Sequence, residues 1–529
     1  MRALRHLVVT SSLVLAALAT VHSEARAITD AALLDSLQAS GFRYFWYQAN
    51  PANGLIRDRS TSGSACSIAA VGFGLSAIAI GIDHGWITRA DGRDRVLTTL
   101  QTFWNGPQGT AASGTIGYKG FFYHFLDMNT ATRAGSDVEL STIDTALLFA
   151  GILDAQQYFD GADTGEVQIR ALADSITRRA DWNFMRNFNP GVLMGWKPGT
   201  GFGGFGQWIG YDEAMILYLE ALGSPTHGVP TSAWQEWTSG YQLQTLYGQT
   251  FITCPPLFTH QYSHCWVDFR RIMDAYTLNA GFTYFQNSQY ATLAQRSYCI
   301  ANPGGFTGYS ASLWGLTASD DPFGYTAHGA PPAQNDDGTI TPTAAISSIP
   351  FEPETCLVVA RTLWNSYHAQ LWGPYGFRDA FNLTDNWWDS DVLGIDQGPI
   401  VLMIENYLTG RVWDRIRLNP QIQTGLSRAG FGNALAVPHG PDAAALALSA
   451  SPAPARASVT LRWMLPAPVR VRLELLDVQG RIVRQLLDAR QDAGAHALVV
   501  PLAGARAGVY LARLDAGGTR TLARIVHVE

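Results

Sequence analysis

Acidic residues stand at three places where a loop leads into an apolar helical pattern, and carboxyl groups there could move protons. The first place is Asp212-Glu213 in the sequence GGFGQWIGYDEAM, where a helix is predicted over Tyr211–Leu222. Phe205 and Trp208 precede the two acids, and aromatic faces stack on sugar rings. These residue types could bind and cleave a sugar, although acids in a first helical turn also commonly just complement the helix dipole.

The second place is the sequence GSDVELSTID, which contains Asp137, Glu139 and Asp144. Capping of the following helix by Ser136 or Asp137 is a purely structural interpretation of this cluster. Asp144, however, stands inside an otherwise apolar stretch, and a buried acid requires either a partner or a function.

The third place is the sequence GIDQGP, where Asp396 precedes the apolar run Ile400–Ile404 and could cap that helix. Trp387 and Trp388 lie just upstream, beside two further aspartates, and could line a sugar subsite. The three clusters would meet at one pocket if the helices that follow them formed a closed ring.

Two carboxyl groups on either side of a glycosidic bond are enough to hydrolyse it. One carboxyl protonates the leaving oxygen, and the other activates water or attacks directly. A helix N-terminus favours the ionised form, so a general acid at Glu213 needs burial or a neighbouring carboxylate such as Asp212 to raise its pKa. A base at Asp396 has no such conflict, because a base must be ionised.

A fourth polar stretch, THQYSHCWVDFRR, contains His260, Tyr262 and His264. Two histidines four residues apart could ligate a metal on a helix, but no glutamate lies between them as in HExxH. We therefore expect a polar, hydrogen-bonded wall of the pocket and no metal. The five cysteines form no CxxC motif and predict no zinc site; Cys254 and Cys265 could form a disulfide or remain buried thiols.

The elements that must position these residues read as about twelve helices up to residue 418. They are predicted over Ala31–Gln48, Ser67–Ile82, Asp91–Phe103, Ser141–Phe159, Glu166–Asp181, Tyr211–Leu222, Trp266–Phe285, Ser288–Ala301, Thr341–Ile349, Pro353–His368, Asp396–Leu408 and Val412–Ile416. Twelve paired helices without an internal repeat favour a closed double ring, the (α/α)6 barrel, over a solenoid. Long loops rich in glycine and aromatics would wall a cleft at one end: Asn50–Ser64, Gly114–Ser136, Pro190–Gly210, Gly304–Gly338 and Trp372–Gly394.

Length and composition predict a globular, exported protein of two domains. The chain has 529 residues, of which 47% are hydrophobic, so it can bury a large core but exceeds the size of one ordinary domain. Residues 1–27 have the charged start, apolar centre and small-x-small end of a secretory signal peptide. The net charge of −7 argues against a nucleic-acid partner, and no other stretch is apolar for long enough to span a membrane.

The composition changes near residue 426, which predicts a catalytic domain over 28–425 and an Ala/Pro-rich linker over 426–455. Beyond the linker, residues alternate between apolar and polar in short runs such as VRVRLEL. About seven such strands in residues 456–529 predict a small β-sandwich.

Ordered motifs through residues 28–418 resemble the bacterial glycoamylase-like domain of glycoside hydrolase family 144. They include GSDVELSTIDTALL, GYDEAM, HQYSHCWVDFR, LWGLTASD, DGTITPTAAISSIPFEPE and GIDQGP. The resemblance implies an (α/α)6 barrel, no metal or other cofactor, and hydrolysis of β-1,2-glucan with anomeric inversion. By motif position it implies Glu213 as general acid, Asp396 as base, and Asp137, Glu139 and Asp144 as assisting or substrate-holding residues.

The C-terminal stretches LELLDVQGRIVRQLL and AGVYLARL resemble the Ig-like domain of the flagellar hook-capping protein and of many exported enzymes. That resemblance implies sorting or surface attachment, through export or anchoring machinery, and a periplasmic, extracellular or cell-surface location.

Together these patterns predict a secreted glycosidase of neutral β-glucan, with Glu213 and Asp396 about 6.5–9.5 Å apart, as inversion requires. Asp212 and the aromatic or histidine side chains of the four stretches would line the subsites: Phe205, Trp208, His260, Tyr262, His264, Trp387 and Trp388. A transglycosylase on the same barrel and a non-catalytic glycan-binding protein are the alternatives.

Overall fold

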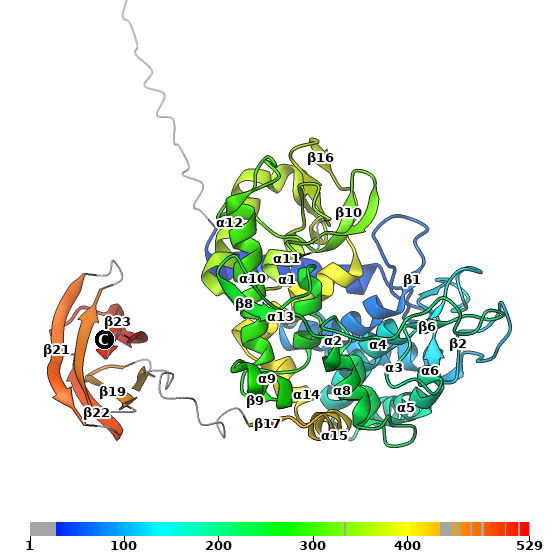
Figure 1. The fold of residues 1–529 in the computed structure, drawn as a ribbon, viewed down its shortest axis with the longest axis horizontal. Helices are drawn as coiled ribbons and strands as arrows, with labels where there is room; N and C mark the ends of the chain where they lie inside the picture. The colour runs from blue at the N-terminus through cyan, green and yellow to red at the C-terminus, as the bar shows by residue number, and fades with distance from the viewer. Residues whose placement is uncertain are drawn as a thin grey trace, which may run out of the picture. The chain divides into compact units, whose positions relative to one another are not determined.

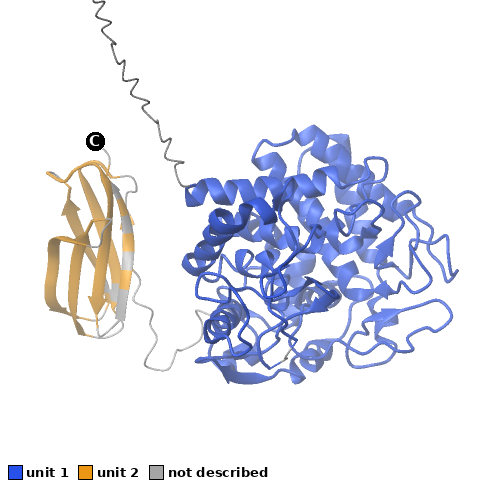
Figure 2. Cartoon of the chain, turned by 90° about the horizontal axis from the view of Figure 1, so that it is seen from above, with its two compact units in different colours: residues 1–434 blue, residues 435–529 orange. Residues whose placement is uncertain are grey.

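The computed structural model divides the chain into two compact units, with the division after Ala434 (Figure 2). The described residues are 28–332, 335–433, 448–451, 455–465, 468–477, 481–492, 494–502, 504–516 and 519–527. The predicted signal peptide and residues 434–447 of the predicted linker lie outside them. Each unit is described by itself.

Five helices of the first unit are buried on nearly all sides and form its inside (Figure 1). They are α2 (Ile68–Asp83), α4 (Thr142–Tyr158), α7 (Met215–Gly223), α11 (Pro342–Ile346) and α13 (Gly394–Leu408). Their sequences are apolar all round, as expected of helices enclosed by other elements. Helix α2 packs against α4 and α13, α4 packs against α7, and α11 packs against α13.

Two 3₁₀ turns, η1 (Leu257–His260) and η2 (Ser263–Cys265), close the ring between α7 and α11. On one side the backbone N–H of Ile216 donates to the hydroxyl of Ser263 at 3.0 Å. On the other side the amide of Gln261 donates to the carbonyl of Ala344 at 2.8 Å. The ring therefore has six positions, of which five are helices and one is a pair of tight turns.

An outer layer of amphipathic helices covers this ring. It consists of α1 (Asp30–Tyr47), α3 (Arg89–Asn105), α5 (Thr164–Arg179), α10 (Tyr284–Ala301), α12 (Pro353–Leu371) and α15 (Pro420–Arg428). Helix α1 packs on α2 and α13, α3 on α2, α5 on α4, α10 on η1, α12 on α11 and α15 on α7. The alternation of inner and outer elements confirms the predicted (α/α)6 barrel.

The predicted helix over Trp266–Phe285 is wrong. The segment contains a turn, the short strand β9 (Ile272–Met273), the six-residue helix α9 (Ala275–Ala280) and the first two residues of α10. Helix α9 ends at Gly281, whose φ of 80° is left-handed. Three further short helices also surround the ring: α6 (Trp182–Arg186), α8 (Ser232–Ser239) and α14 (Arg411–Ile416).

Two glycines let α2 and α4 approach closely. A Cβ atom at Gly72 would lie 2.1 Å from the carbonyl oxygen of Leu147, and one at Gly151 would lie 2.0 Å from the carbonyl oxygen of Gly72. Neither contact is sterically possible, so both positions require glycine for the observed spacing of the inner ring.

Short antiparallel strand pairs precede several inner helices. Strand β1 (Cys66–Ser67) pairs with β4 (Phe125–Leu126), and β5 (Leu140–Ser141) pairs with β6 (Gly195–Trp196). Ser67 and Ser141 then cap α2 and α4 by accepting backbone N–H groups. The other short strands are β2 (Gly117–Tyr118), β3 (Phe121–Phe122), β7 (Leu243–Leu246), β8 (Gln249–Ile252), β10 (Ala318–Asp321), β11 (Gly324–Ala327), β12 (Thr339–Ile340), β13 (Trp372–Gly373), β14 (Gly376–Phe377), β15 (Phe381–Asn382), β16 (Trp387–Trp388) and β17 (Gly432–Asn433).

The second unit is a sandwich of two antiparallel sheets. One sheet has the order β18 (Leu448–Ser451), β19 (Ser458–Leu465), β22 (Gly494–Pro501), and the other β21 (Ile482–Gln491), β20 (Val469–Leu476), β23 (Gly508–Ala516), β24 (Thr519–His527). Side chains such as Leu461 and Val500 from the first sheet and Leu473 and Leu514 from the second share one core. The prediction of a seven-stranded sandwich is confirmed.

The first unit continues beyond the predicted end at residue 425. Helix α15 extends to Arg428, and Gly432–Asn433 pairs with Ile272–Met273 of β9. In the part of the chain that the structure describes, no helix combines the length and apolar character needed to cross a membrane.

Candidate active site

A cavity of about 580 Å³ opens at the end of the barrel where the inner helices begin. Its lining residues are Asp58, Arg59, Ser67, His124, Phe125, Glu139, Ser141, Ile143, Asp144, Leu147, Met194, Phe205, Trp208, Glu213, Phe258, Tyr262, Ala318, Tyr325, Leu393 and Ile395. Each of the five long loops singled out in the sequence contributes at least one of them. The prediction that these loops wall one cleft is therefore confirmed.

Glu213 lines the cavity from the turn that precedes α7. Burial, together with the negative charges of Asp212 and Asp144, raises the pKa of Glu213 to about 8. Asp212 accepts hydrogen bonds from the Trp237 indole at 2.9 Å and from the N–H of Ala214. The two acids stand before the first turn of α7, not in it as predicted, and Glu213 holds its proton at neutral pH.

Asp396 lies just behind the cavity wall, in the first turn of α13, and is only 3% exposed. Its neighbour Ile395 lines the cavity, and Tyr262 donates its hydroxyl to the Ile395 carbonyl at 3.1 Å. A side-chain hydrogen bond joins Asp396 to the buried carboxyl of Asp379.

Burial and the nearby carboxylates of Asp320, Asp58 and Asp389 raise the pKa of Asp396 to about 7. Burial and the charge of Asp396 raise the pKa of Asp379 well above its usual value, and the hydrogen bond between the two raises it while lowering the pKa of Asp396. Asp379 therefore keeps its proton and donates it in the hydrogen bond to Asp396. The expectation that ionisation of Asp396 meets no conflict is wrong, because burial and the neighbouring carboxylates disfavour its charged form.

His124 connects two of the three acids of the second cluster, Glu139 and Asp144. Its Nδ1 lies 2.9 Å from a carboxylate oxygen of Glu139, and its Nε2 lies 3.4 Å from one of Asp144. Burial disfavours the imidazolium, but these two carboxylates outweigh it and raise the pKa of His124 to about 9. Asp137, the third acid of this cluster, is exposed and does not line the cavity.

Arg59 forms a second cationic bridge. Its guanidinium donates to Asp320 at 2.8 Å and to Asp58 at 3.2 Å. The arginine thereby connects the loop after α1 to the hairpin β10–β11. The two cations that line the cavity, Arg59 and His124, each hold two carboxylates, whereas neither Glu213 nor Asp396 forms an ion pair with a described residue.

Three of the predicted aromatic residues, Phe205, Trp208 and Tyr262, line the cavity. The Trp208 indole donates to the hydroxyl of Thr142 at 3.0 Å, which fixes the orientation of its ring. Trp387 and Trp388 do not line it. Trp388 stacks on Phe381, with ring centroids 5.2 Å apart, because strand β16 pairs with β15 and sets these two residues opposite each other.

His260 and His264 are core residues, and their predicted place in the pocket wall is wrong. His260 is fully buried and donates from Nε2 to the Cys254 carbonyl at 3.1 Å. His264 lies 3.1 Å from the hydroxyl of Ser288. Burial lowers the pKa of both imidazoles to about 3, so they are neutral. All five cysteines are free thiols, including Cys254 and Cys265.

The sequence did not single out several residues of the site as candidates. These are Asp58, Arg59, His124, Phe258, Tyr325 and Asp379. All except Phe258 lie in the five long loops, and their place in those loops was the only available signal.

Comparison with known proteins assigns the fold and the family. Residues 206–420 match the family model "Glycoamylase", described as "Putative glucoamylase". A protein of Bacteroides uniformis with that description has 36% identity and a TM-score of 0.71, over 77% of this chain and 98% of its own. The endo-β-1,2-glucanase of Chitinophaga pinensis, solved with sophorotriose and glucose, has 30% identity and a TM-score of 0.71, over 77% of this chain and 99% of its own.

A curated relative is also similar over most of the first unit. It is the exo-β-1,2-glucooligosaccharide sophorohydrolase (non-reducing end) of Parabacteroides distasonis, 32% identical over 77% of this chain. The chain spans 59% of the length of that relative. With these similarities, and with the motifs placed around one cavity, the chain belongs to the glycoamylase-like family that contains these bacterial β-1,2-glucan hydrolases.

Proposed function

We propose that this protein is a glycoside hydrolase that cleaves β-1,2-linked glucan by an inverting mechanism. The names of two relatives support the substrate, since one is an endo-β-1,2-glucanase and another a β-1,2-glucooligosaccharide sophorohydrolase. The cavity supports a neutral sugar, because its acids are either paired with cations or hold protons, and Trp208 and Phe205 offer stacking faces.

The observation that carries the proposal is the state of Glu213. Among the acids that line the cavity, Glu213 forms no ion pair with a described residue. Its raised pKa keeps it protonated at neutral pH. A general acid must have this property, because it gives its proton to the leaving oxygen as the glycosidic bond breaks.

Asp396 is the proposed base. With the shared proton on Asp379, Asp396 carries the charge of the pair and can accept a proton from water. The water oxygen attacks the anomeric carbon, the bond to the leaving oxygen breaks, Glu213 protonates that oxygen, and Asp396 takes the proton of the water. Solvent then returns the proton from Asp396 to Glu213. The separation of 6.5–9.5 Å between these carboxyl groups stays a prediction.

We also propose that the protein is exported and that the second unit is an Ig-like module for sorting or surface attachment. The secretory pattern of residues 1–27 and the motifs of the C-terminal strands support this role.

Incubation of the purified protein with a panel of α- and β-linked glucans tests the proposed function. Chromatography should show release of short linear β-1,2-linked glucose oligomers from β-1,2-glucan alone. Products of several lengths from the start indicate endo action, and sophorose alone indicates exo action. New linkages or cyclic products would instead identify a transglycosylase, and binding without any new reducing ends would identify a non-catalytic protein.

A further inference from the structure

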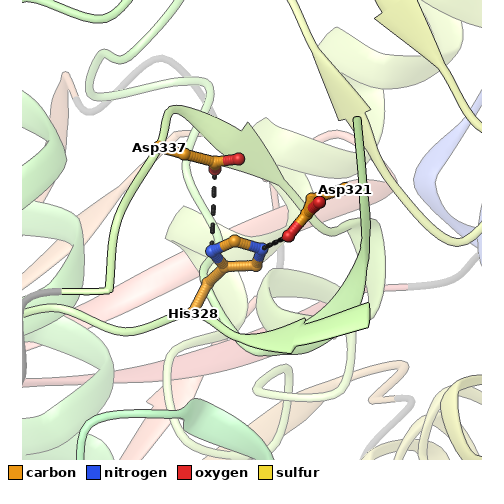
Figure 3. Close-up of side chains that lie close together, drawn as sticks. All are labelled: Asp321, His328 and Asp337. Atoms are coloured by element: carbon orange, nitrogen blue, oxygen red, sulfur yellow. Dashed lines mark ion pairs between the residues drawn. The ribbon is translucent and has the colours of Figure 1, made fainter. Parts of the chain in front are cut away.

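Asp321, His328 and Asp337 lie together beside the hairpin of β10 and β11 (Figure 3). One potential ligand atom of each lies within 4.8 Å of the other two. Asp321 is 8% exposed and His328 is 2% exposed. None of the three lines the catalytic cavity, so the cluster is separate from the groups that act on the substrate.

The two nitrogens of His328 have different surroundings. Nδ1 lies 2.9 Å from the backbone carbonyl of Asn335, which can only accept, so Nδ1 carries a hydrogen. Oδ1 of Asp337 lies 3.6 Å from the same nitrogen (Figure 3). Nε2 has no hydrogen-bond partner among the described residues, although it is buried, and it lies 3.3 Å from Oδ2 of Asp321 (Figure 3).

That distance distinguishes a proton from a metal between the two atoms. A charge-assisted N–H···O bond is typically about 2.7–2.9 Å long. Two ligands that each lie about 2.0–2.1 Å from a tetrahedral ion are about 3.3 Å apart. The observed 3.3 Å between Nε2 and Oδ2 fits two atoms on one ion better than it fits a hydrogen bond.

As with the imidazole, hydrogen bonds to protein groups hold one polar atom of each carboxylate in place. Oδ1 of Asp321 accepts the N–H groups of Phe323 and Gly324, and the hydroxyl of Thr326 also bonds this carboxylate. Oδ1 of Asp337 accepts the N–H of Thr339 at 2.9 Å, whereas its Oδ2 is buried without a partner in the described part of the chain. Protein groups that hold the second polar atom of each ligand are the usual outer layer of a metal site.

We propose that Asp321, His328 and Asp337 bind a divalent transition-metal ion of the zinc class, with water as a fourth ligand. One imidazole and two carboxylates suit Zn²⁺ in tetrahedral geometry, whereas Ca²⁺ and Mg²⁺ select oxygen ligands alone. This assignment differs from the expectation that the chain holds no metal. No short sequence motif predicts the site, because its three residues are spread through one long loop.

The site supports the fold and takes no part in hydrolysis. Asp321 is the last residue of strand β10, and the hairpin of β10 and β11 carries Ala318 and Tyr325, both of which line the catalytic cavity. Asp337 lies two residues before β12, which leads directly into the inner helix α11. An ion bound by all three residues would therefore fix the hairpin to the barrel wall.

Metal binding by the full-length protein tests the proposal. The chain is stripped with EDTA, dialysed against Zn²⁺, and analysed by mass spectrometry for metal content and by calorimetry for Tm. The variants are Asp337→Asn, which is isosteric and should fold, and His328→Ala. His227→Ala, which removes an exposed histidine, is the matched control.

The expected result is about one Zn²⁺ per chain in the wild type and in the control, with a higher Tm than the stripped protein. In Asp337→Asn and His328→Ala, Zn²⁺ affinity should fall by at least the ~10–100-fold that even a lost outer partner costs. Co²⁺ in place of Zn²⁺ should give the visible absorption bands of a tetrahedral site. Failure of the wild type to retain Zn²⁺, or equal retention by Asp337→Asn, would overturn the proposal and leave His328 as a side chain held between two carboxylates.

Discussion

The carboxyl groups of Asp379 and Asp396 are joined by a hydrogen bond behind the wall of the catalytic cavity. Oδ2 of Asp379 accepts the N–H of Asp320 at 2.7 Å, so Oδ1 is left for the proton that the two acids share. Two buried carboxylates in contact cannot both ionise. Asp379 thus acts as a positioning residue, since it orients Asp396 and reaches the substrate only through it.

The acid side of the pH–activity profile should depend on the hydrogen bond from Asp379. Asp396 must be ionised, so activity should fall as the pH drops below about 7, where burial places its pKa. Asp379→Leu removes a hydrogen-bond donor that lowers the pKa of Asp396. The acid limb of the kcat/KM profile should therefore move up by about 1–2 pH units, because this shift corresponds to the free energy of one hydrogen bond to a charged group. Asp379→Asn keeps a donor and should stay near the wild type. An unmoved limb in Asp379→Leu would show that the bond does not control the base.

Glu213→Gln should abolish turnover and leave substrate binding intact. Loss of the general acid should reduce kcat by about 10²–10⁴-fold. In the wild type, activity should also fall as the pH rises above about 8, because Glu213 then loses its proton. Steady-state kinetics and calorimetric binding of a β-1,2-linked oligosaccharide measure these effects. Glu354→Gln, an exposed residue of α12, is the control. Near-normal kcat in Glu213→Gln would exclude Glu213 as the acid.

Trp208 and Trp388 should differ in their effect on substrate affinity. Trp208 lines the cavity, so Trp208→Ala should raise KM by about ten-fold or more, which corresponds to ~1.4 kcal/mol of lost binding. Trp388 stacks on Phe381 away from the cavity, so Trp388→Ala should lower Tm and leave KM unchanged. The reverse pattern would show that sugar occupies the face near β16.

Glu220→Met should stabilise the protein. Glu220 is fully buried in α7, and neither of its carboxyl oxygens has a hydrogen-bond partner among the described residues. Burial raises its pKa well above the ordinary value, so the folded state loses stability as the pH rises beyond that value. An apolar side chain should recover about 1–3 kcal/mol, measured by denaturant unfolding at pH 8.

Glu166→Met is the matched control, because the buried Glu166 is paired with Arg89 at 2.7 Å. This variant should lose stability, since the substitution leaves the Arg89 guanidinium without its carboxylate. If both substitutions destabilised the protein, the Glu220 carboxyl group would have to make a stabilising polar interaction in the folded state.

Local sequence patterns predicted the fold and part of the site. Apolar runs that continue around all sides of a helix, as in α2 and α4, are readable without tertiary information. The sequence also predicted the position of Glu213 between a glycine-rich loop and an apolar helix. It could not predict that residues 257–265 form 3₁₀ turns in place of a sixth inner helix, because hydrogen bonds with α7 and α11 hold these turns in place.

The errors in the site share one physical cause. His260 and His264 were placed in the pocket by their polarity, but partners from other segments, the Cys254 carbonyl and Ser288, satisfy them in the core. Asp379 and His124 were overlooked because their roles come from contacts with distant segments or across a loop. A single sequence shows which side chains are polar, whereas the fold decides which polar groups are already satisfied.

The configuration of the first sugar released from β-1,2-glucan tests the central claim most directly. Proton NMR during the first minutes of digestion distinguishes the α- from the β-anomer before mutarotation mixes them. Glu213 as acid and Asp396 as base, with water between Asp396 and the sugar, predict that the α-anomer appears first. Initial release of the β-anomer would contradict the account, because it requires a carboxylate that attacks the sugar directly.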